Sequence, residues 1–354
     1  MQRFYLHVGP PKTGTSYLQS AMWRSRPVLR QQGLALAMRR RLDHFHVMLD
    51  VTDQGVAGAD PPEAFTALDR LERFVTRSDA ERILLSHESL AAATRDQALR
   101  LLGLLDDLEV HLVITARDLA RQVPSGWQQR VKARETIRFE AYVDAVVATE
   151  GIGRAFWAYH DLLDIADRWG RALPPGQVHI VTVPPPGSPP GLLLDRWCSV
   201  LGLDPVTIDT SAATSNPSLG RVQAEVLRRV NEAIGDELPH VRGRYGRVPR
   251  ELLPRDVLGV QAGQPNQLPR RLQTWCEDRS RTTVQDLQTR RYDVVGDLHD
   301  LLPTMQSAAD PPVTEEEIAA AATRALARTL VLRHQELAGG SAVEPQPGDR
   351  DVPE

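Results

Sequence analysis

The chain alternates short, almost wholly apolar runs with longer segments of helical periodicity, and this alternation constrains its fold more than any other feature. Five runs have the length and composition of buried strands: residues 4–8, 34–38, 82–86, 110–115 and 178–183. Helical periodicity fills most of the intervals, for example over residues 15–32 and 95–105. Apolar strands that alternate with helices are typical of a parallel sheet covered on both faces. We therefore predict an α/β fold with a P-loop-like parallel sheet of about five strands flanked by helices.

The second half of the chain has a different composition. A Pro/Gly-rich loop at residues 184–190 precedes a predicted helix over 192–201, and apolar spacing predicts another helix over 221–234. From residue 239 to residue 269 the chain is rich in Pro, Gly and Arg and has little periodicity, which is typical of a functional or disordered loop. We expect a mostly helical and irregular C-terminal part.

The C-terminal end contains one more strong helical signal. Apolar spacing predicts a helix over residues 314–337, and Thr314 with Glu317 forms a capping-box pattern at its start. Residues 340–354 are rich in Pro, Gly and acidic residues, a composition that predicts disorder.

Composition narrows the function classes. The formal net charge of −4 disfavours a nucleic-acid-binding protein, because no basic excess is available to neutralise phosphates. The two cysteines, Cys198 and Cys276, form no disulfide framework and no metal-ligand spacing, and they fit a reducing compartment. Residues 1–9 lack the pattern of a signal peptide, and no stretch approaches the ~18 apolar residues that span a bilayer. We therefore expect a soluble, cytoplasmic protein without a membrane span.

The strongest functional signal is residues 9–16, Gly-Pro-Pro-Lys-Thr-Gly-Thr-Ser, between a predicted strand and a predicted helix. Glycine lets backbone amides approach an anion, and the helix N-terminus, the lysine charge and the hydroxyls add to phosphate binding. The loop is not a Walker A motif, because Lys12 precedes Gly14 here, with Thr15 after it. The alternative is an accidental Gly/Pro turn before a helix.

The order Pro-Lys-Thr-Gly-Thr-Ser, followed by x-Leu-Gln, closely resembles the 5′-phosphosulfate-binding loop of sulfotransferases that use 3′-phosphoadenosine-5′-phosphosulfate (PAPS). In that family the lysine contacts the leaving phosphate oxygen, and the resemblance gives this role to Lys12. The residues that the resemblance implies for binding the 5′-phosphate are Pro11, Lys12, Thr13, Gly14, Thr15 and Ser16.

A second family feature is a strand that ends in arginine, followed eight positions later by a helical serine, and this pair binds the 3′-phosphate of PAPS. Here the strand predicted at residues 110–115 leads to Arg117, and Ser125 lies eight residues further on. An arginine fork and a hydroxyl suit a phosphate monoester. Pro124 should kink or interrupt the helix just before the serine. Arg121 could join the same cluster or be solvated.

The catalytic base should lie at the carboxyl end of a strand, where ligands bind in such sheets. The strand predicted at residues 82–86 is followed by His87 and Glu88. Members of the family use either a histidine or a glutamate. We favour Glu88, because Ser-His-Glu-Ser-Leu resembles the strand-end Ser-x-Glu pattern of the bacterial, carbohydrate-type branch, and His87 is the second candidate. The alternative for either residue is a structural or helix-capping role.

Two weaker features lie further along the chain. Residues 216–220, Asn-Pro-Ser-Leu-Gly, resemble a short element found before a late helix in related bacterial sulfotransferases. Four arginines in the Pro/Gly-rich segment could form a lid over PAPS or over an acidic acceptor, or a solvated loop: Arg242, Arg244, Arg247 and Arg250.

The resemblance implies a sulfotransferase domain over residues 1–305, with its core motifs in residues 3–135 and an acceptor or lid region at about 205–305. A C-terminal helix over 306–339 and a disordered tail over 340–354 would follow. The predicted activity is metal-independent, in-line transfer of a sulfuryl group from PAPS to a hydroxyl or amine, with 3′-phosphoadenosine-5′-phosphate (PAP) as product. The acceptor is a small molecule or a carbohydrate, and the sequence does not indicate which one. It also does not indicate an oligomeric state.

Two other functions stay open. A nucleotide-dependent kinase with an altered loop would need a magnesium-binding Ser or Thr directly after a lysine and a strand-end aspartate, for which Asp118 is the candidate. A non-catalytic protein that binds PAPS or PAP would keep the pocket without turnover.

Overall fold

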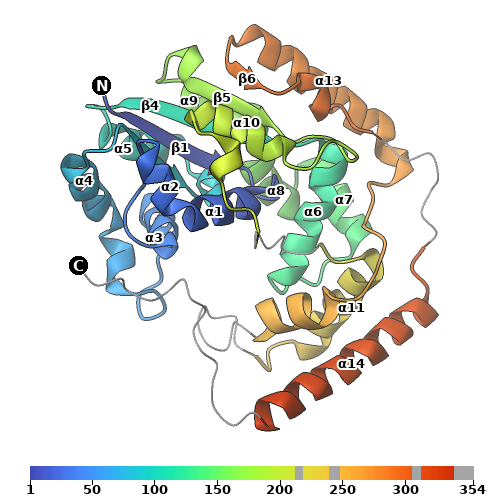
Figure 1. Cartoon of the computed structure of the whole chain (residues 1–354). Helices are drawn as coiled ribbons and strands as arrows, with labels where there is room; N and C mark the ends of the chain where they lie inside the picture. Colours follow the sequence, from blue (N-terminus) through green and yellow to red (C-terminus); the bar gives the residue numbers. More distant parts are fainter. Residues whose placement is uncertain (212–217, 239–247, 305–311, 339–354) are drawn as a thin grey trace. The chain divides into compact units, whose positions relative to one another are not determined.

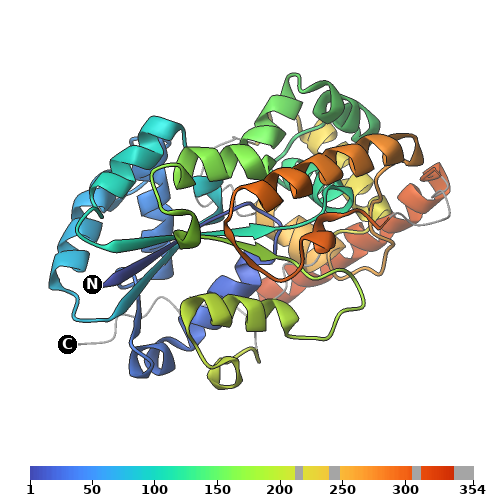
Figure 2. The ribbon, with the colours of Figure 1, turned by 90° about the horizontal axis from the view of Figure 1, so that it is seen from above.

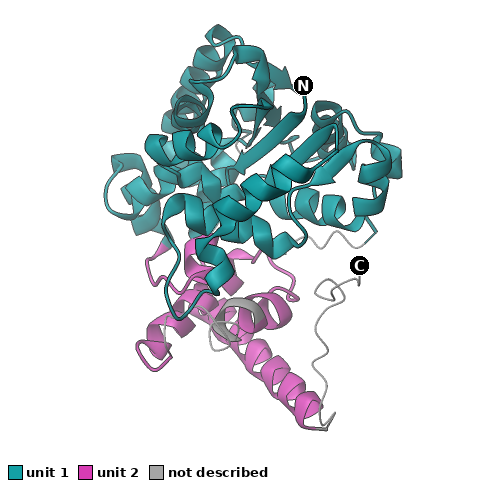
Figure 3. Ribbon diagram, turned by 90° about the vertical axis from the view of Figure 1, so that its left-hand side faces the viewer, with its two compact units in different colours: residues 1–127, 139–216, 267–310 teal, residues 128–138, 217–266, 311–354 magenta. Residues whose placement is uncertain are grey.

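The structure is a computed structural model that describes residues 1–211, 218–238, 248–304 and 312–338. The chain divides into two compact units, coloured separately in Figure 3. Unit 1 comprises residues 1–127, 139–216 and 267–310, and unit 2 comprises residues 128–138, 217–266 and 311–354. The C-terminal helix therefore belongs to the same unit as residues 217–266.

Unit 1 is built on a six-stranded, all-parallel sheet with the order β2-β3-β1-β4-β5-β6 (Figure 1). Its strands are β1 (Arg3–Gly9), β2 (Leu34–Leu36), β3 (Arg82–Ser86), β4 (Glu109–Ala116), β5 (Val178–Thr182) and β6 (Asp293–Val295). The predicted α/β class and the five predicted strands are confirmed. The sixth strand, at the sheet edge, was not predicted.

Both faces of the sheet are covered, as Figure 2 shows from above. Alternate residues of β1 point to opposite faces, so Phe4, Leu6 and Val8 join one apolar cluster and Tyr5 joins the other. The first cluster packs against α3 (Arg41–Thr52), α4 (Ala67–Arg77), α5 (Arg95–Gly103), α9 (Leu162–Gly170) and α13 (Gln273–Thr289). The second packs against α1 (Thr15–Arg24), α2 (Arg26–Gln31) and α10 (Leu192–Leu201). The remaining helices of unit 1 are α7 (Phe139–Ala148), α8 (Ile152–His160) and the short helices η1 (Pro62–Phe65), η2 (Glu88–Ala92), η3 (Pro175–Gln177), η4 (Pro205–Thr207), η6 (Arg270–Leu272) and η7 (Leu298–Leu301).

The helical periodicity over residues 15–32 is confirmed, but the chain breaks at Ser25 into two helices, α1 and α2. Pro27 lies at the start of α2. A proline has no N–H to donate to the preceding turn, and it is tolerated in the first turn of a helix rather than in its interior. The chain therefore ends one helix and begins another just before Pro27.

Helix α6 (Leu119–Lys132) follows β4 and runs without interruption through Pro124. The expected interruption before Ser125 is therefore wrong. The ring removes one backbone hydrogen bond, while the helical bonds on either side continue. Ser125 keeps a helical position two turns into α6.

The order in which strands are added to the sheet reverses between the neighbouring strands β1 and β4. The connection after β1 leads to β2 and β3 on one side, whereas the connection after β4 leads to β5 and β6 on the other. Ligands of open parallel sheets bind at such a reversal, at the carboxyl ends of the strands. The loop after Gly9 and the segment after Ala116 lie at this point.

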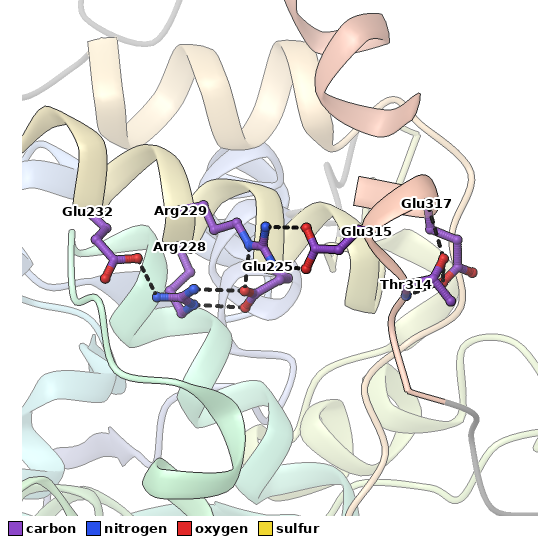
Figure 4. A network of polar contacts seen from close by, with 7 residues as sticks. All are labelled: Glu225, Arg228, Arg229, Glu232, Thr314, Glu315 and Glu317. Carbon is purple, nitrogen blue, oxygen red and sulfur yellow. Dashed lines mark hydrogen bonds and ion pairs between the residues drawn. The ribbon is translucent and has the colours of Figure 1, made fainter. Parts of the chain in front are cut away.

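Unit 2 contains α11 (Arg221–Ile234), α14 (Glu315–Ala338) and a π-helix, η5 (Val248–Leu258). The helices predicted over residues 221–234 and 314–337 are confirmed. Thr314 and Glu317 form the predicted capping box, with Glu317 N–H donating to Thr314 Oγ1 at 3.2 Å (Figure 4). The expectation of an irregular segment over 239–269 is wrong for residues 248–258, which are helical.

A charged network fastens α11 to the first turn of α14 (Figure 4). Arg228 binds both oxygens of Glu225 at 2.8 Å and also Glu232 at 3.0 Å. Arg229 binds Glu225 and reaches both oxygens of Glu315 at 2.6 and 2.7 Å. Arg228 is buried, so its pairing matters more for stability than that of the exposed Glu315.

Candidate functional site

The loop between β1 and α1 has the backbone of an anion-binding turn. Lys12 has φ 68° and Gly14 has φ 86°, both in the left-handed region. Gly14 is the N-cap of α1 and has no side chain to bind the first amides of the helix. These amides therefore stay available as donors at the positive end of the α1 dipole.

A second glycine brings this loop close to the segment after β3. Gly9 has φ 102°, and a Cβ atom at this position would lie 2.6 Å from the backbone oxygen of Glu88. Only glycine allows this approach. The end of β1 and the candidate base are therefore neighbours through their backbones.

Thr13 uses its hydroxyl within the protein. The side chain is fully buried, and its Oγ1 donates to the Pro10 carbonyl at 2.7 Å and contacts Thr115 Oγ1. Thr115 Oγ1 also donates to the Gly9 carbonyl at 3.2 Å. Thr13 thus anchors the loop to β4, and what it offers to a ligand is its backbone amide.

Arg117 connects the two predicted phosphate motifs. Its Nη1 donates to the Lys12 carbonyl at 2.9 Å and to Ser125 Oγ at 3.3 Å. Among the described residues, the buried Nε of Arg117 has no hydrogen-bond partner. Burial, and after it the charge of Arg121, lowers the pKa of Arg117 to about 10, against the opposite effect of Asp118. The group stays protonated at neutral pH and keeps a buried donor for an anion.

Arg121 does not join this pair. Its guanidinium binds Asp118 and donates to the carbonyls of Pro184 and Val183 at 3.0 and 3.3 Å. The other oxygen of Asp118 accepts from the Arg121 backbone N–H at 2.9 Å. Both residues therefore join the start of α6 to the segment after β5.

A small pocket of about 40 Å³ adjoins Arg117. Its lining residues are Arg117, Leu119, Trp157, His160, Asp161, Leu162, Arg279, Ser280, Thr283 and Leu301. Gln122 Nε2 donates to the Pro11 carbonyl at 2.6 Å and lies 2.8 Å from His160 Nδ1. Burial, and then the charge of Lys12, lowers the pKa of His160 to about 3, so its ring is neutral near pH 7. The volume holds a few water molecules or one small group.

The two candidate bases follow β3 but have different surroundings. His87 Nδ1 accepts from the Ser89 backbone N–H at 3.3 Å and caps η2. Glu88 Oε2 accepts from Gln19 Nε2 at 2.9 Å. Burial would raise the pKa of Glu88, but the charge of His87, a hydrogen bond from the backbone N–H of Glu88 itself and the hydrogen bond from Gln19 bring it below its usual value. Burial lowers the pKa of His87. Glu88 is therefore ionised and able to accept a proton at neutral pH.

Sequence reasoning gave no role to Gln19, which joins this site together with Arg41. Arg41 donates from Nη2 to Gln19 Oε1 at 3.2 Å and from Nη1 to Ser20 Oγ at 3.2 Å. Gln19 thereby has its carbonyl toward Arg41 and its NH₂ toward Glu88. The signal in the sequence was the position of Gln19 in the Leu-Gln pair after the loop.

Two buried histidines support the same region. His7 Nδ1 lies 2.8 Å from Ser86 Oγ and its Nε2 lies 3.3 Å from Thr115 Oγ1, so it joins β1 to both neighbouring strands. His44 accepts from the Ser86 backbone N–H at Nδ1 and donates from Nε2 to the Ala37 carbonyl at 2.8 Å. Their hydrogen bonds fix the strand end that precedes His87.

The weaker sequence features fall mostly outside the described residues. This is true of Asn216, Pro217, Arg242, Arg244 and Arg247, and of the side chain of Arg250. Leu219 is described, and its carbonyl accepts from Gln128 Nε2 at 2.8 Å within unit 2.

Comparisons of the chain with protein-family models, with curated proteins and with solved structures found no significant match. In the part of the chain that the structure describes, no helix has both the length and the apolar character needed to cross a membrane. Within the same residues, no group of three or more His, Cys, Asp or Glu side chains has the arrangement of a metal site.

Proposed function

We propose that the protein is a sulfotransferase that moves a sulfuryl group from PAPS to a hydroxyl or amine of an acceptor. The observation that carries the proposal is the position of Arg117, which donates to both the Lys12 carbonyl and the Ser125 hydroxyl. Two motifs that the sequence suggested separately thus lie within hydrogen-bond distance of each other. A nucleotide with phosphates at both its 5′ and 3′ positions suits two adjoining anion-binding groups.

Two features of the described residues fit such a ligand. Arg117 keeps a buried Nε donor without a protein partner, and the N-terminus of α1 has glycine as its N-cap. In the proposal, Arg117 and Ser125 hold the 3′-phosphate. The residues that would hold the 5′-phosphate are Pro11, Lys12, Thr13, Gly14, Thr15 and Ser16.

The chemistry follows from two side chains. PAPS, when bound, supplies the sulfuryl group on a phosphate leaving group. Lys12 stabilises the negative charge that remains on that phosphate when its bond to sulfur breaks. Glu88 takes the proton of the acceptor oxygen or nitrogen as the new bond to sulfur forms. Because Oε2 of Glu88 accepts the Gln19 hydrogen bond, Oε1 is the atom assigned to the proton.

The kinase alternative has less support from the described residues. The residue directly after Lys12 is Thr13, whose buried hydroxyl donates to the Pro10 carbonyl rather than facing a metal site. Both oxygens of Asp118, the candidate metal ligand, are bound by Arg121. A non-catalytic PAPS-binding protein stays as the second candidate, because it would keep the same phosphate contacts.

Turnover with ³⁵S-labelled PAPS tests the proposal. The protein is incubated with pools of sugars, alcohols and amines, and labelled ester and PAP are measured. Glu88→Gln should lower transfer about 100-fold or more, the usual contribution of a general base, while the exposed Glu150→Gln serves as the matched control. Transfer that survives in Glu88→Gln and is lost in His87→Gln would move the base to His87. PAP binding without transfer to any pool would favour the non-catalytic protein.

A further inference from the structure

A group of exposed positive charge lies beside the candidate site. We define the arginine cluster as Arg26 and Arg30 of α2, Arg39 of the turn before α3, and Arg41, the first residue of α3. Arg26 Nη1 donates to the Arg39 carbonyl at 2.7 Å, which joins the two segments. Burial, and then the charges of Arg30 and Arg39, lowers the pKa of Arg26. The Arg26 guanidinium is therefore repelled by those of Arg30 and Arg39.

Two carboxylates act on the cluster without an ion pair to it: Asp43 attracts Arg26, and Glu88 attracts Arg41. Asp43 binds Arg70 at 2.6 Å and Arg40 at 3.3 Å, so its charge is shared with arginines outside the cluster. In the described parts of the chain, no carboxylate forms an ion pair with a member of the cluster. Repulsion of this kind lowers stability unless an anion binds.

One member of the cluster is connected directly to the candidate base. Arg41 donates to Gln19 Oε1, and Gln19 Nε2 donates to Glu88 Oε2. Arg41 donates two hydrogen bonds to the neutral side chains of Gln19 and Ser20, and a guanidinium has five N–H donors. An exposed cation with unused donors thus lies one side chain away from Glu88.

We propose that the arginine cluster binds an anionic group of the acceptor, a carboxylate or a sulfate ester, while the reacting hydroxyl or amine is held at Glu88. This rests on the proposed sulfotransferase function. Guanidinium groups match both anions with paired hydrogen bonds. Neutralising the charge of Arg41 on binding also removes a positive field from beside Glu88 and makes it a stronger base. Neutral acceptors gain neither effect.

Binding of three matched sugars, measured by saturation-transfer NMR with and without PAP, tests the inference. The probes are methyl β-glucoside, methyl β-glucuronide and methyl β-glucoside 6-sulfate, which share one ring. We expect the charged probes to bind about tenfold more tightly than the neutral one, the effect of one charge-assisted contact. The two charged arms distinguish carboxylate from sulfate recognition.

Arg41→Gln and Arg39→Gln should remove the preference for the charged probes, and the exposed Arg171→Gln, which follows α9, should keep it. Equal binding of all three sugars, no binding of any, or an unchanged preference in Arg41→Gln would overturn the inference. Calorimetry with PAP on the same samples separates the two proposals. If the unmodified protein does not bind PAP, the proposed sulfotransferase function is overturned. If it binds PAP but does not prefer the charged sugars, only the proposed acceptor class is overturned.

Discussion

Gln19 donates a 2.9 Å hydrogen bond from its amide nitrogen to Glu88 Oε2, and this bond connects α1 with the segment that follows β3. Arg41 binds the other end of the same amide at 3.2 Å. The orientation of Gln19 is therefore set from both sides. Glu88 is therefore held from the side of α1 through its Oε2 atom.

Removing this bond should make Glu88 more basic. The hydrogen bond from Gln19 stabilises the charged carboxylate and so lowers its pKa. We expect Gln19→Ala to raise the pKa of Glu88 and to shift the acidic limb of the rate profile to higher pH. The measurement is a ¹³C NMR titration of glutamate-labelled protein, with the Glu88 signal assigned by Glu88→Gln. An unchanged or lower pKa would contradict the geometry.

A side chain at Gly14, in the turn before α1, should lower the stability of unit 1. A Cβ atom there would lie 2.5 Å from Leu193 Cδ2, and φ is 86°. Gly14→Ala should destabilise unit 1 by roughly 1–2 kcal/mol, the cost of a left-handed alanine, plus the cost of moving Leu193. Urea unfolding without ligand measures this change. Gly176→Ala, where a Cβ meets nothing within 4 Å, is the control and should change little.

Much of the fold followed from the sequence because buried parallel strands are apolar over their whole length. The strand at Arg82–Ser86 and the helix at Leu192–Leu201 have the predicted bounds. β6 was missed because Asp293–Val295 is three residues long and lies at the sheet edge, where little apolar sequence is needed. The π-helix at Val248–Leu258 was missed because its prolines and arginines obscure helical spacing.

The site was predictable only where a residue type and its position in the chain carried the chemistry. The lysine loop and the Arg117–Ser125 spacing have such a pattern, and the structure brings them together. Gln19 and Arg41 are 22 residues apart and meet through tertiary packing, so no local pattern indicates their contact. The buried hydroxyl of Thr13 likewise depends on Thr115 in another strand.

Acid should destabilise unit 1 through its buried histidines, among them His7, His44 and His160. Burial lowers the pKa of His7 and His44 from the ordinary 6.5 to about 4. Between pH 6.5 and 4 these histidines are protonated in the unfolded chain but stay neutral in the folded protein, so the free energy of unfolding falls as the pH falls. The slope approaches about 1.4 kcal/mol per pH unit for each histidine. Urea unfolding from pH 7 to pH 5 measures it.

His44→Gln should reduce that slope, because it removes one of the buried groups that titrate differently in the two states. The exposed His299→Gln is the control and should leave the slope as it is. A free energy of unfolding that does not change between pH 6.5 and 5 would show that these histidines are not held neutral.

In the charged network of unit 2, Arg228 should contribute more to the free energy of unfolding than Arg229. Arg228→Ala leaves Glu225 without its bidentate partner in a partly buried position. It should lower stability by about 2 kcal/mol, less than the loss from a fully buried pair. Arg229→Ala removes contacts with the exposed Glu315 and should cost clearly less. Equal losses in urea unfolding would contradict this ranking of the two arginines.

The most direct test of the central claim is calorimetric binding of PAP, compared with ADP and with ATP plus magnesium. We predict that PAP binds without magnesium and at least about tenfold more tightly than ADP, because Arg117 and Ser125 add charge-assisted contacts to the 3′-phosphate. Arg117→Ala should bring PAP close to ADP. Preference for magnesium-ATP, with no effect of the 3′-phosphate, would contradict the sulfotransferase and favour a kinase.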